Sequence, residues 1–135
     1  ITEALLVLMR DEVAQRGADF LVATSSAGFD VHPDPSVRRD LMRRWGIPSL
    51  FYADLRIKAL GGRKGFSVLN LGKPLQAYAE RRKTFLHGFG DSIGQGHWNE
   101  EGHRRAGELM AEKVCKLQGS NRGEGFPRFR NLVLN

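Results

Sequence analysis

The stretch Phe20-Leu21-Val22-Ala23-Thr24 decides the fold class, because it is a continuous apolar run of strand length. Such a run is typical of a strand buried on both faces, as in a parallel sheet. Residues 66–71 form a second run of the same character, with Gly65 before it and Gly72 after it. We therefore expect two strands, at residues 20–24 and 66–71. Residues 47–52 are a weaker candidate for a brief third strand.

Helical patterns surround these runs. We expect helices over residues 3–16, after a cap at Ser36, over 54–60 with Gly61-Gly62 as the stop, from Pro74 onward, and from a cap at Asn99 to Gly119. Strands that alternate with helices predict an α/β fold with a parallel sheet covered on both faces. Because two or three strands make a thin sheet, we interpret residues 1–119 as part of a three-layer α/β domain. Composition predicts an irregular or disordered tail over 120–135.

The bulk composition is that of one globular domain. The chain has 135 residues, of which 41% are hydrophobic and 27% charged. No apolar run approaches the ~20 residues that span a bilayer. The single cysteine, Cys115, excludes an internal disulfide and a cysteine-rich zinc site. The net charge of +6 is scattered as basic pairs, without a recognisable nucleic-acid module, so we expect no nucleic-acid partner.

Chemistry in an open parallel α/β sheet is expected in the loops at the carboxyl ends of the strands. Three loops qualify: residues 25–35, residues 70–73 and the glycine-rich loop that leads to His97. The third is the richest, because flexible glycines precede a histidine that lies two residues before the Asn99 cap. A neutral histidine in this position can accept the proton of a serine hydroxyl if another group orients its second ring nitrogen.

The stretch Gly96-His97-Trp98-Asn99-Glu100-Glu101-Gly102-His103, followed by an amphipathic helix, resembles the last conserved block of the SGNH/GDSL hydrolases. Residues 17–22, 50–54 and 65–71 resemble the stretches that precede this block, so the resemblance covers residues 1–117. It implies a flavodoxin-like α/β/α fold and a serine esterase or lipase-like hydrolase without cofactor or metal. His97 would be the general base, and the substrate a small-molecule or carbohydrate ester.

The sequence departs from the family pattern at three points. Gly94 stands where the family usually has an aspartate three residues before the histidine, so Asp91 is the candidate orienting carboxylate, with a backbone carbonyl or a water molecule as alternatives. Gly90-Asp91-Ser92 spells the family's nucleophile motif, but it does not follow an apolar strand. Ser92 is therefore a weak candidate nucleophile, and a plain turn is the alternative. No block for the oxyanion hole is evident, and we expect it, with the family's nucleophile, upstream of Ile1.

The alternatives belong to other classes of protein. A non-catalytic α/β remnant would bind a partner, or self-associate, through an exposed sheet edge. A zinc site of His87, His97 and His103 is disfavoured by the spacing of six residues between the last two. His103 alone is expected to pack or to form a hydrogen bond, and Asp54 to cap a helix.

Overall fold

A computed structural model describes residues 1–121. The elements are α1 (Thr2–Gln15), β1 (Leu21–Thr24), α2 (Pro35–Trp45), α3 (Tyr52–Lys64), β2 (Ser67–Asn70), α4 (Gly72–Arg82), a short 3-10 turn η1 (Gly90–Ser92) and α5 (Glu100–Asn121). The predicted mixed α/β class is confirmed. Of the predicted tail, residues 122–135 lie outside the described part. No helix within residues 1–121 is long and apolar enough to cross a membrane.

The two predicted strands pair in parallel. Leu21 lies opposite Ser67 and Thr24 opposite Asn70, so both carboxyl ends meet at one edge of the sheet. The predicted third strand at residues 47–52 is wrong, because this segment forms turns that lead into α3. Pro48 has no backbone N–H to donate to a neighbouring strand, and the Ser49 hydroxyl accepts a hydrogen bond from the Phe51 amide at 3.1 Å.

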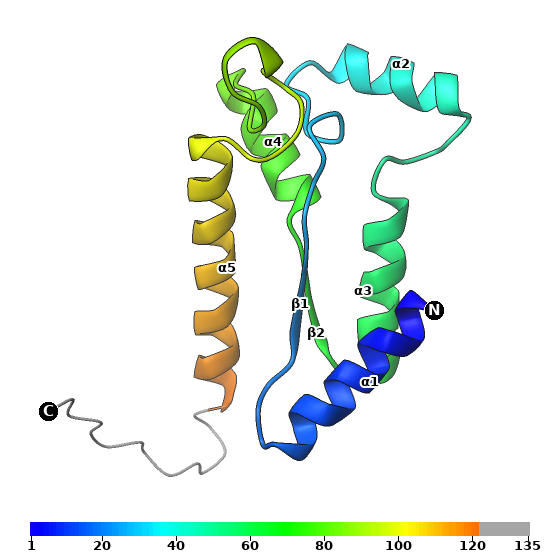
Figure 1. Cartoon of the computed structure of the whole chain (residues 1–135), viewed down its shortest axis with the longest axis vertical. Helices are drawn as coiled ribbons and strands as arrows, with labels where there is room; N and C mark the ends of the chain where they lie inside the picture. Colours follow the sequence, from blue (N-terminus) through cyan, green and yellow to red (C-terminus); the bar gives the residue numbers. More distant parts are fainter. Residues whose placement is uncertain (122–135) are drawn as a thin grey trace, which may run out of the picture.

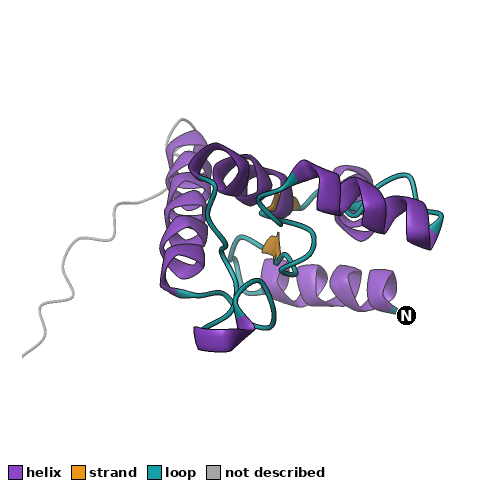
Figure 2. Cartoon of the chain, turned by 90° about the horizontal axis from the view of Figure 1, so that it is seen from above, coloured by secondary structure: helices purple, strands orange, loops and turns teal. Residues whose placement is uncertain are grey.

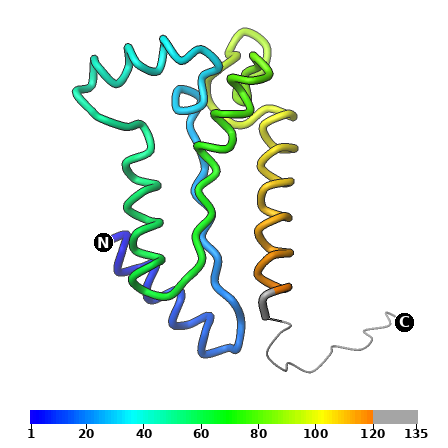
Figure 3. The backbone as a smooth tube through the Cα atoms, turned by 180° about the vertical axis from the view of Figure 1, so that it is seen from behind, coloured from blue at the N-terminus to red at the C-terminus, as the bar shows by residue number. Residues whose placement is uncertain are grey.

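Helices lie on both sides of the strand pair. α5 runs along one side, and α1 with α3 runs along the other (Figures 1 and 3). Seen from above, the strands lie between these helices (Figure 2). The expectation of fully buried strands is wrong for the described residues, because every strand residue is at most half-buried and Ala23 is exposed.

The hydrophobic core sits near the carboxyl ends of the strands and not between α1 and the sheet. It comprises residues of the loop after β1, the end of β2, α4, the following loop and α5: Val31, Leu71, Leu75, Tyr78, Ala79, Leu86 and Ala106. Trp98 packs against this cluster. The best-packed part of the molecule therefore supports the loops in which chemistry is expected.

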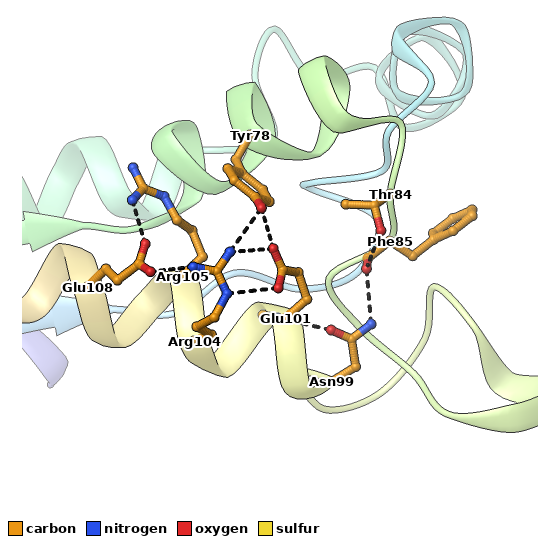
Figure 4. A network of polar contacts seen from close by, with 9 residues as sticks. Tyr78, Thr84, Phe85, Asn99, Glu101, Arg104, Arg105 and Glu108 are labelled. Atoms are coloured by element: carbon orange, nitrogen blue, oxygen red, sulfur yellow. Dashed lines mark hydrogen bonds and ion pairs between the residues drawn. The ribbon is translucent and has the colours of Figure 1, made fainter.

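A polar network fastens the first turns of α5 to α4 (Figure 4). The Tyr78 hydroxyl donates to the Glu101 carboxylate, and Arg104 donates to the Tyr78 oxygen at 3.0 Å. Arg104 also donates to both oxygens of Glu101, at 2.9 and 2.6 Å. These hydrogen bonds lower the pKa of Glu101 to about 2, so the carboxylate stays charged over the whole ordinary pH range. The network fixes where α5 begins, and so where the preceding loop ends.

Two predicted helix boundaries are wrong in an informative way. Asp34, not Ser36, caps α2: its carboxylate accepts from the Ser36 amide at 2.7 Å, and Pro35 occupies the first turn, where it is favoured. Gly119 does not stop α5, which continues to Asn121. Ser36 is a reasonable residue for a helix start and Gly119 for a helix end. Asp34 takes the capping position instead, and α5 continues past Gly119.

Gly61-Gly62 does not stop α3 either, because the helix continues to Lys64 and ends at Gly65 with φ 71°. Gly61 is buried where α3 packs on β2. A Cβ atom there would lie 2.5 Å from Val68 Cγ2 and 2.8 Å from the Phe66 carbonyl oxygen. Gly61 is therefore needed for close packing, whereas a Cβ atom on Gly62 would point into open space, with no neighbouring atom within 4 Å.

These two adjacent glycines predict opposite effects of the same substitution. Gly61→Ala should lower the free energy of unfolding by about 1–3 kcal/mol, because the new methyl group overlaps β2. Gly62→Ala should raise it by about 0.5–1 kcal/mol, because alanine is the better helix former at an open position. Urea unfolding followed by circular dichroism measures both. Equal effects of the two substitutions would contradict the packing of α3 on β2.

Candidate functional site

A pocket of about 280 Å³ lies where the loop after β1 meets the loop before α5. It is lined by two serines, three histidines, a tryptophan and a glycine: Ser25, Ser26, His87, Gly96, His97, Trp98 and His103. The serines directly follow the carboxyl end of β1, where sites form in parallel sheets. The structure thus brings together residues that are about 70 positions apart in the sequence.

The loop that carries His97 is closed on itself by backbone hydrogen bonds. The Gly88 amide donates to the His97 carbonyl at 2.9 Å, and the Asn99 amide donates to the Leu86 carbonyl at 3.0 Å. The predicted cap is confirmed, since the Asn99 side-chain oxygen accepts from the Gly102 amide at 2.9 Å. Its side-chain nitrogen donates to the Phe85 carbonyl at 3.0 Å (Figure 4). Asn99 therefore joins both ends of the loop to the start of α5.

Two aromatic rings from this loop hold Ser26. The Trp98 ring nitrogen donates to the Ser26 hydroxyl at 3.2 Å. His87 Nε2 lies 3.0 Å from the Ser26 carbonyl oxygen. Because a carbonyl only accepts, the hydrogen of neutral His87 lies on Nε2 and leaves Nδ1 as an acceptor. Burial lowers the pKa of His87, so the neutral ring is favoured.

The two loops approach each other at Gly28. A Cβ atom on this residue would lie 2.0 Å from the Gly94 carbonyl oxygen, a distance at which the two loops would have to separate. Gly28 itself is buried. The absence of a side chain at this position therefore allows the loop after β1 to lie against the His97 loop, with Ser26 between the two rings.

His97 itself is exposed and lines the pocket. Asp91 and Ser92 are also exposed, but they belong to η1 and do not line it. No hydrogen bond joins either of their side chains to His97 in the described part of the chain. Backbone bonds from the Ser92 amide to Phe89 and from the Gln95 amide to Ser92 shape η1 as a tight turn. The orienting and nucleophilic roles of Asp91 and Ser92 thus remain predictions.

His103 is the other accessible imidazole of the pocket. Its ring stands edge-on to Trp98, with the ring centres 5.6 Å apart. Although His87, His97 and His103 all line the pocket, no group of three or more residues within 1–121 is arranged to hold a metal ion.

Sequence reasoning pointed to the loop after β1 but did not single out Ser25 and Ser26. The signal was their position, because they are the first two residues after the strand. Ser25 is exposed, whereas Ser26 is half-buried and already accepts from Trp98. The two hydroxyls therefore differ in how freely they can reach a ligand.

A pair of carboxylates occupies the same edge of the sheet. Asp54 is not the predicted cap of α3, since Phe51 holds that position and Asp54 is the third helical residue. Burial raises the pKa of Asp54, with a smaller opposing contribution from Thr24. Burial also raises the pKa of Asp30, and the negative charge of Asp54 raises it further. The charge of Asp54 therefore disfavours the ionised form of Asp30. The Ala27 amide opposes this shift, because it donates a hydrogen bond to the Asp30 carboxylate at 2.9 Å.

The raised pKa of Asp54 predicts a pH-dependent effect of Asp54→Asn. Because its pKa is raised, the folded protein holds the Asp54 proton more tightly than the unfolded chain, so stability falls as the pH rises through the folded-state pKa. Asp54→Asn should therefore raise the free energy of unfolding near neutral pH. The advantage should disappear on acidification.

Urea unfolding over a pH series measures this effect, with Asp91→Asn as the matched control at an exposed loop carboxylate. A gain that does not change with pH, or one that Asp91→Asn reproduces, would show that the charge of Asp54 is not its cause.

Comparisons with known proteins give this pocket no counterpart. No protein-family model, no curated protein and no solved structure was found to match the chain. What the chain does must therefore be argued from the chemistry of the residues that the fold brings together around His97.

Proposed function

We propose that the chain is a serine-type ester hydrolase in which His97 is the general base. The observation that carries this proposal is that His97 shares one pocket with Ser25 and Ser26, the residues that follow β1. The resemblance of residues 96–103 to the SGNH hydrolases supports the same role for His97. It also supports a three-layer, flavodoxin-like arrangement, with which the helices on both sides of the strands are consistent.

The reaction uses these groups in two steps. His97 takes the proton of a serine hydroxyl as its oxygen attacks the acyl carbon, and then gives that proton to the leaving alcohol. His97 next takes a proton from the water that attacks the acyl-serine, and gives it to the serine oxygen as the acid leaves. Gly96 lines the pocket and its amide donates no hydrogen bond within residues 1–121, which makes this amide the candidate donor to the oxyanion. The substrate is an ester-linked acyl group on a small molecule or a carbohydrate.

His97→Ala should lower hydrolysis of a short-chain aryl ester by roughly 10²–10⁴-fold, because the general base is lost. A fluorophosphonate probe, followed by peptide mass spectrometry, should label Ser25 or Ser26, and the label should be lost in His97→Ala. Ser25→Ala and Ser26→Ala, tested singly, identify the nucleophile.

The unfolding transition of each variant, measured in parallel, separates loss of chemistry from loss of fold. Activity that survives in His97→Ala but not in His103→Ala would transfer the role of base to His103. A folded wild-type protein that neither hydrolyses the ester nor takes the label would reject the hydrolase.

A second candidate function is a non-catalytic module that self-associates. Within residues 1–121, β1 and β2 pair only with each other, so their outer edges remain open. Helix α1 adds an apolar surface, since none of its residues is buried and Leu5, Leu8 and Met9 are exposed. Open edges and exposed apolar surface favour association between chains.

Self-association predicts a molar mass, measured by light scattering, that rises with protein concentration. Leu8→Glu should reduce the association, because it places a charge on the apolar face of α1. Gln15→Glu adds the same charge at an exposed position of the same helix and should have little effect. A concentration-independent monomer would contradict this function and leave the hydrolase as it stands.

A further inference from the structure

A second hollow region lies on a different part of the molecule, between α2, the 47–51 segment and α4. It consists of two adjoining hollows of about 310 and 700 Å³, which share Arg39, Met42 and Pro48. We refer to them together as the α2–α4 groove. None of the residues that line it also lines the pocket at His97.

The charged residues of the α2–α4 groove are all cationic: Arg38, Arg39, Arg43 and Lys73. Two of them already have partners. Buried Arg38 donates to the His32 carbonyl and to the Glu80 carboxylate, and Arg43 pairs with Asp40. The Arg38 pair links α2 to α4, whereas the Arg43 pair is an exposed contact within α2, and in both the cation already has a carboxylate partner.

Arg39 and Lys73 differ from these two, since neither forms an ion pair within the described residues. Both are exposed, and they come from different helices, α2 and α4. Asp34 attracts Arg39 at a distance, but its carboxylate already accepts from the amide and hydroxyl of Ser36. The groove thus offers two cations from two different helices, and no carboxylate lines it.

Apart from Ser49 and Gln76, the other residues that line the groove are apolar or glycine. Met42, Ile47 and Leu50 are half-buried along it, and Phe51 is 7% exposed. A polyanion such as a nucleic acid would gain nothing from these side chains, whereas an alkyl chain would lose water-exposed surface on them. Cations beside an apolar hollow match a molecule with one negative head and one hydrocarbon chain.

We propose that the α2–α4 groove binds a free, single-chain anionic amphiphile, of which a long-chain carboxylate is the simplest case. The head lies between Arg39 and Lys73, and the chain lies on Met42, Ile47 and Leu50. This proposal goes beyond the hydrolase, because it needs neither His97 nor catalysis.

Isothermal titration calorimetry with fatty carboxylates below their micellar concentration tests the site. Decanoate should bind at least about tenfold more tightly than decanol or decyltrimethylammonium. Each added methylene should tighten Kd by about twofold to fourfold, the range expected for partial to full burial. The titration is repeated with His97→Ala. Because this variant lacks the proposed general base, its decanoate binding does not depend on whether the chain is a hydrolase.

The matched variants each remove two positive charges. Arg39→Gln with Lys73→Gln should weaken decanoate at least about tenfold. Arg44→Gln with Arg82→Gln removes one exposed cation from each of the same two helices, outside the groove, and should leave Kd within about twofold. Equal losses in the two double variants would overturn the site, as would equal binding of decanol. Binding to anionic vesicles without binding to monomeric decanoate would show that the groove contacts a membrane surface and does not bind a free amphiphile.

Discussion

Two ring N–H groups on one serine hold the site together. His87 donates to the Ser26 carbonyl and Trp98 to the Ser26 hydroxyl, and both rings come from a loop more than 60 residues further along the chain. Gly28 permits this contact, because any side chain there would collide with the Gly94 backbone. The pocket therefore exists only while the loop after β1 and the loop before α5 stay in contact, and the Asn99 cap fixes the second loop to α5.

The same contact distinguishes the roles of the histidines. His87 is 2% exposed, and its Nδ1 has no partner within the described residues. A proton on Nδ1 would bury a charged donor without an acceptor, which is costly, so His87 is suited to holding Ser26 in its neutral form and not to exchanging protons. His97 is exposed at the same pocket and can exchange protons with a substrate or with water. For the proposed hydrolase, the exposure of His97 therefore favours it over buried His87 as the base.

Sequence reasoning placed the strands and the Asn99 cap correctly from local signals, although local signals at Ser36 and Gly119 gave wrong helix ends. The apolar runs at residues 20–24 and 66–71 became β1 and β2, and Asn99 became a cap, because each depends on a few adjacent residues. It failed where a distant contact decides. From the sequence, Gly61 is typical of a helix stop, but in the structure it allows close packing on Val68. Ser26 is an ordinary loop residue in the sequence, but in the structure it is hydrogen-bonded to His87 and Trp98. Those partners are invisible to periodicity and propensity.

The loop between β1 and α2 links the pocket to the α2–α4 groove. At its start, Ser26 is held by the two rings of the pocket. Further along, Gln76 of α4 donates to the Asp30 carbonyl at 2.8 Å, and Arg38 of α2 donates to the His32 carbonyl. Gln76 and Arg38 also line the groove. One loop is thus hydrogen-bonded to groove residues at one end and to pocket residues at the other.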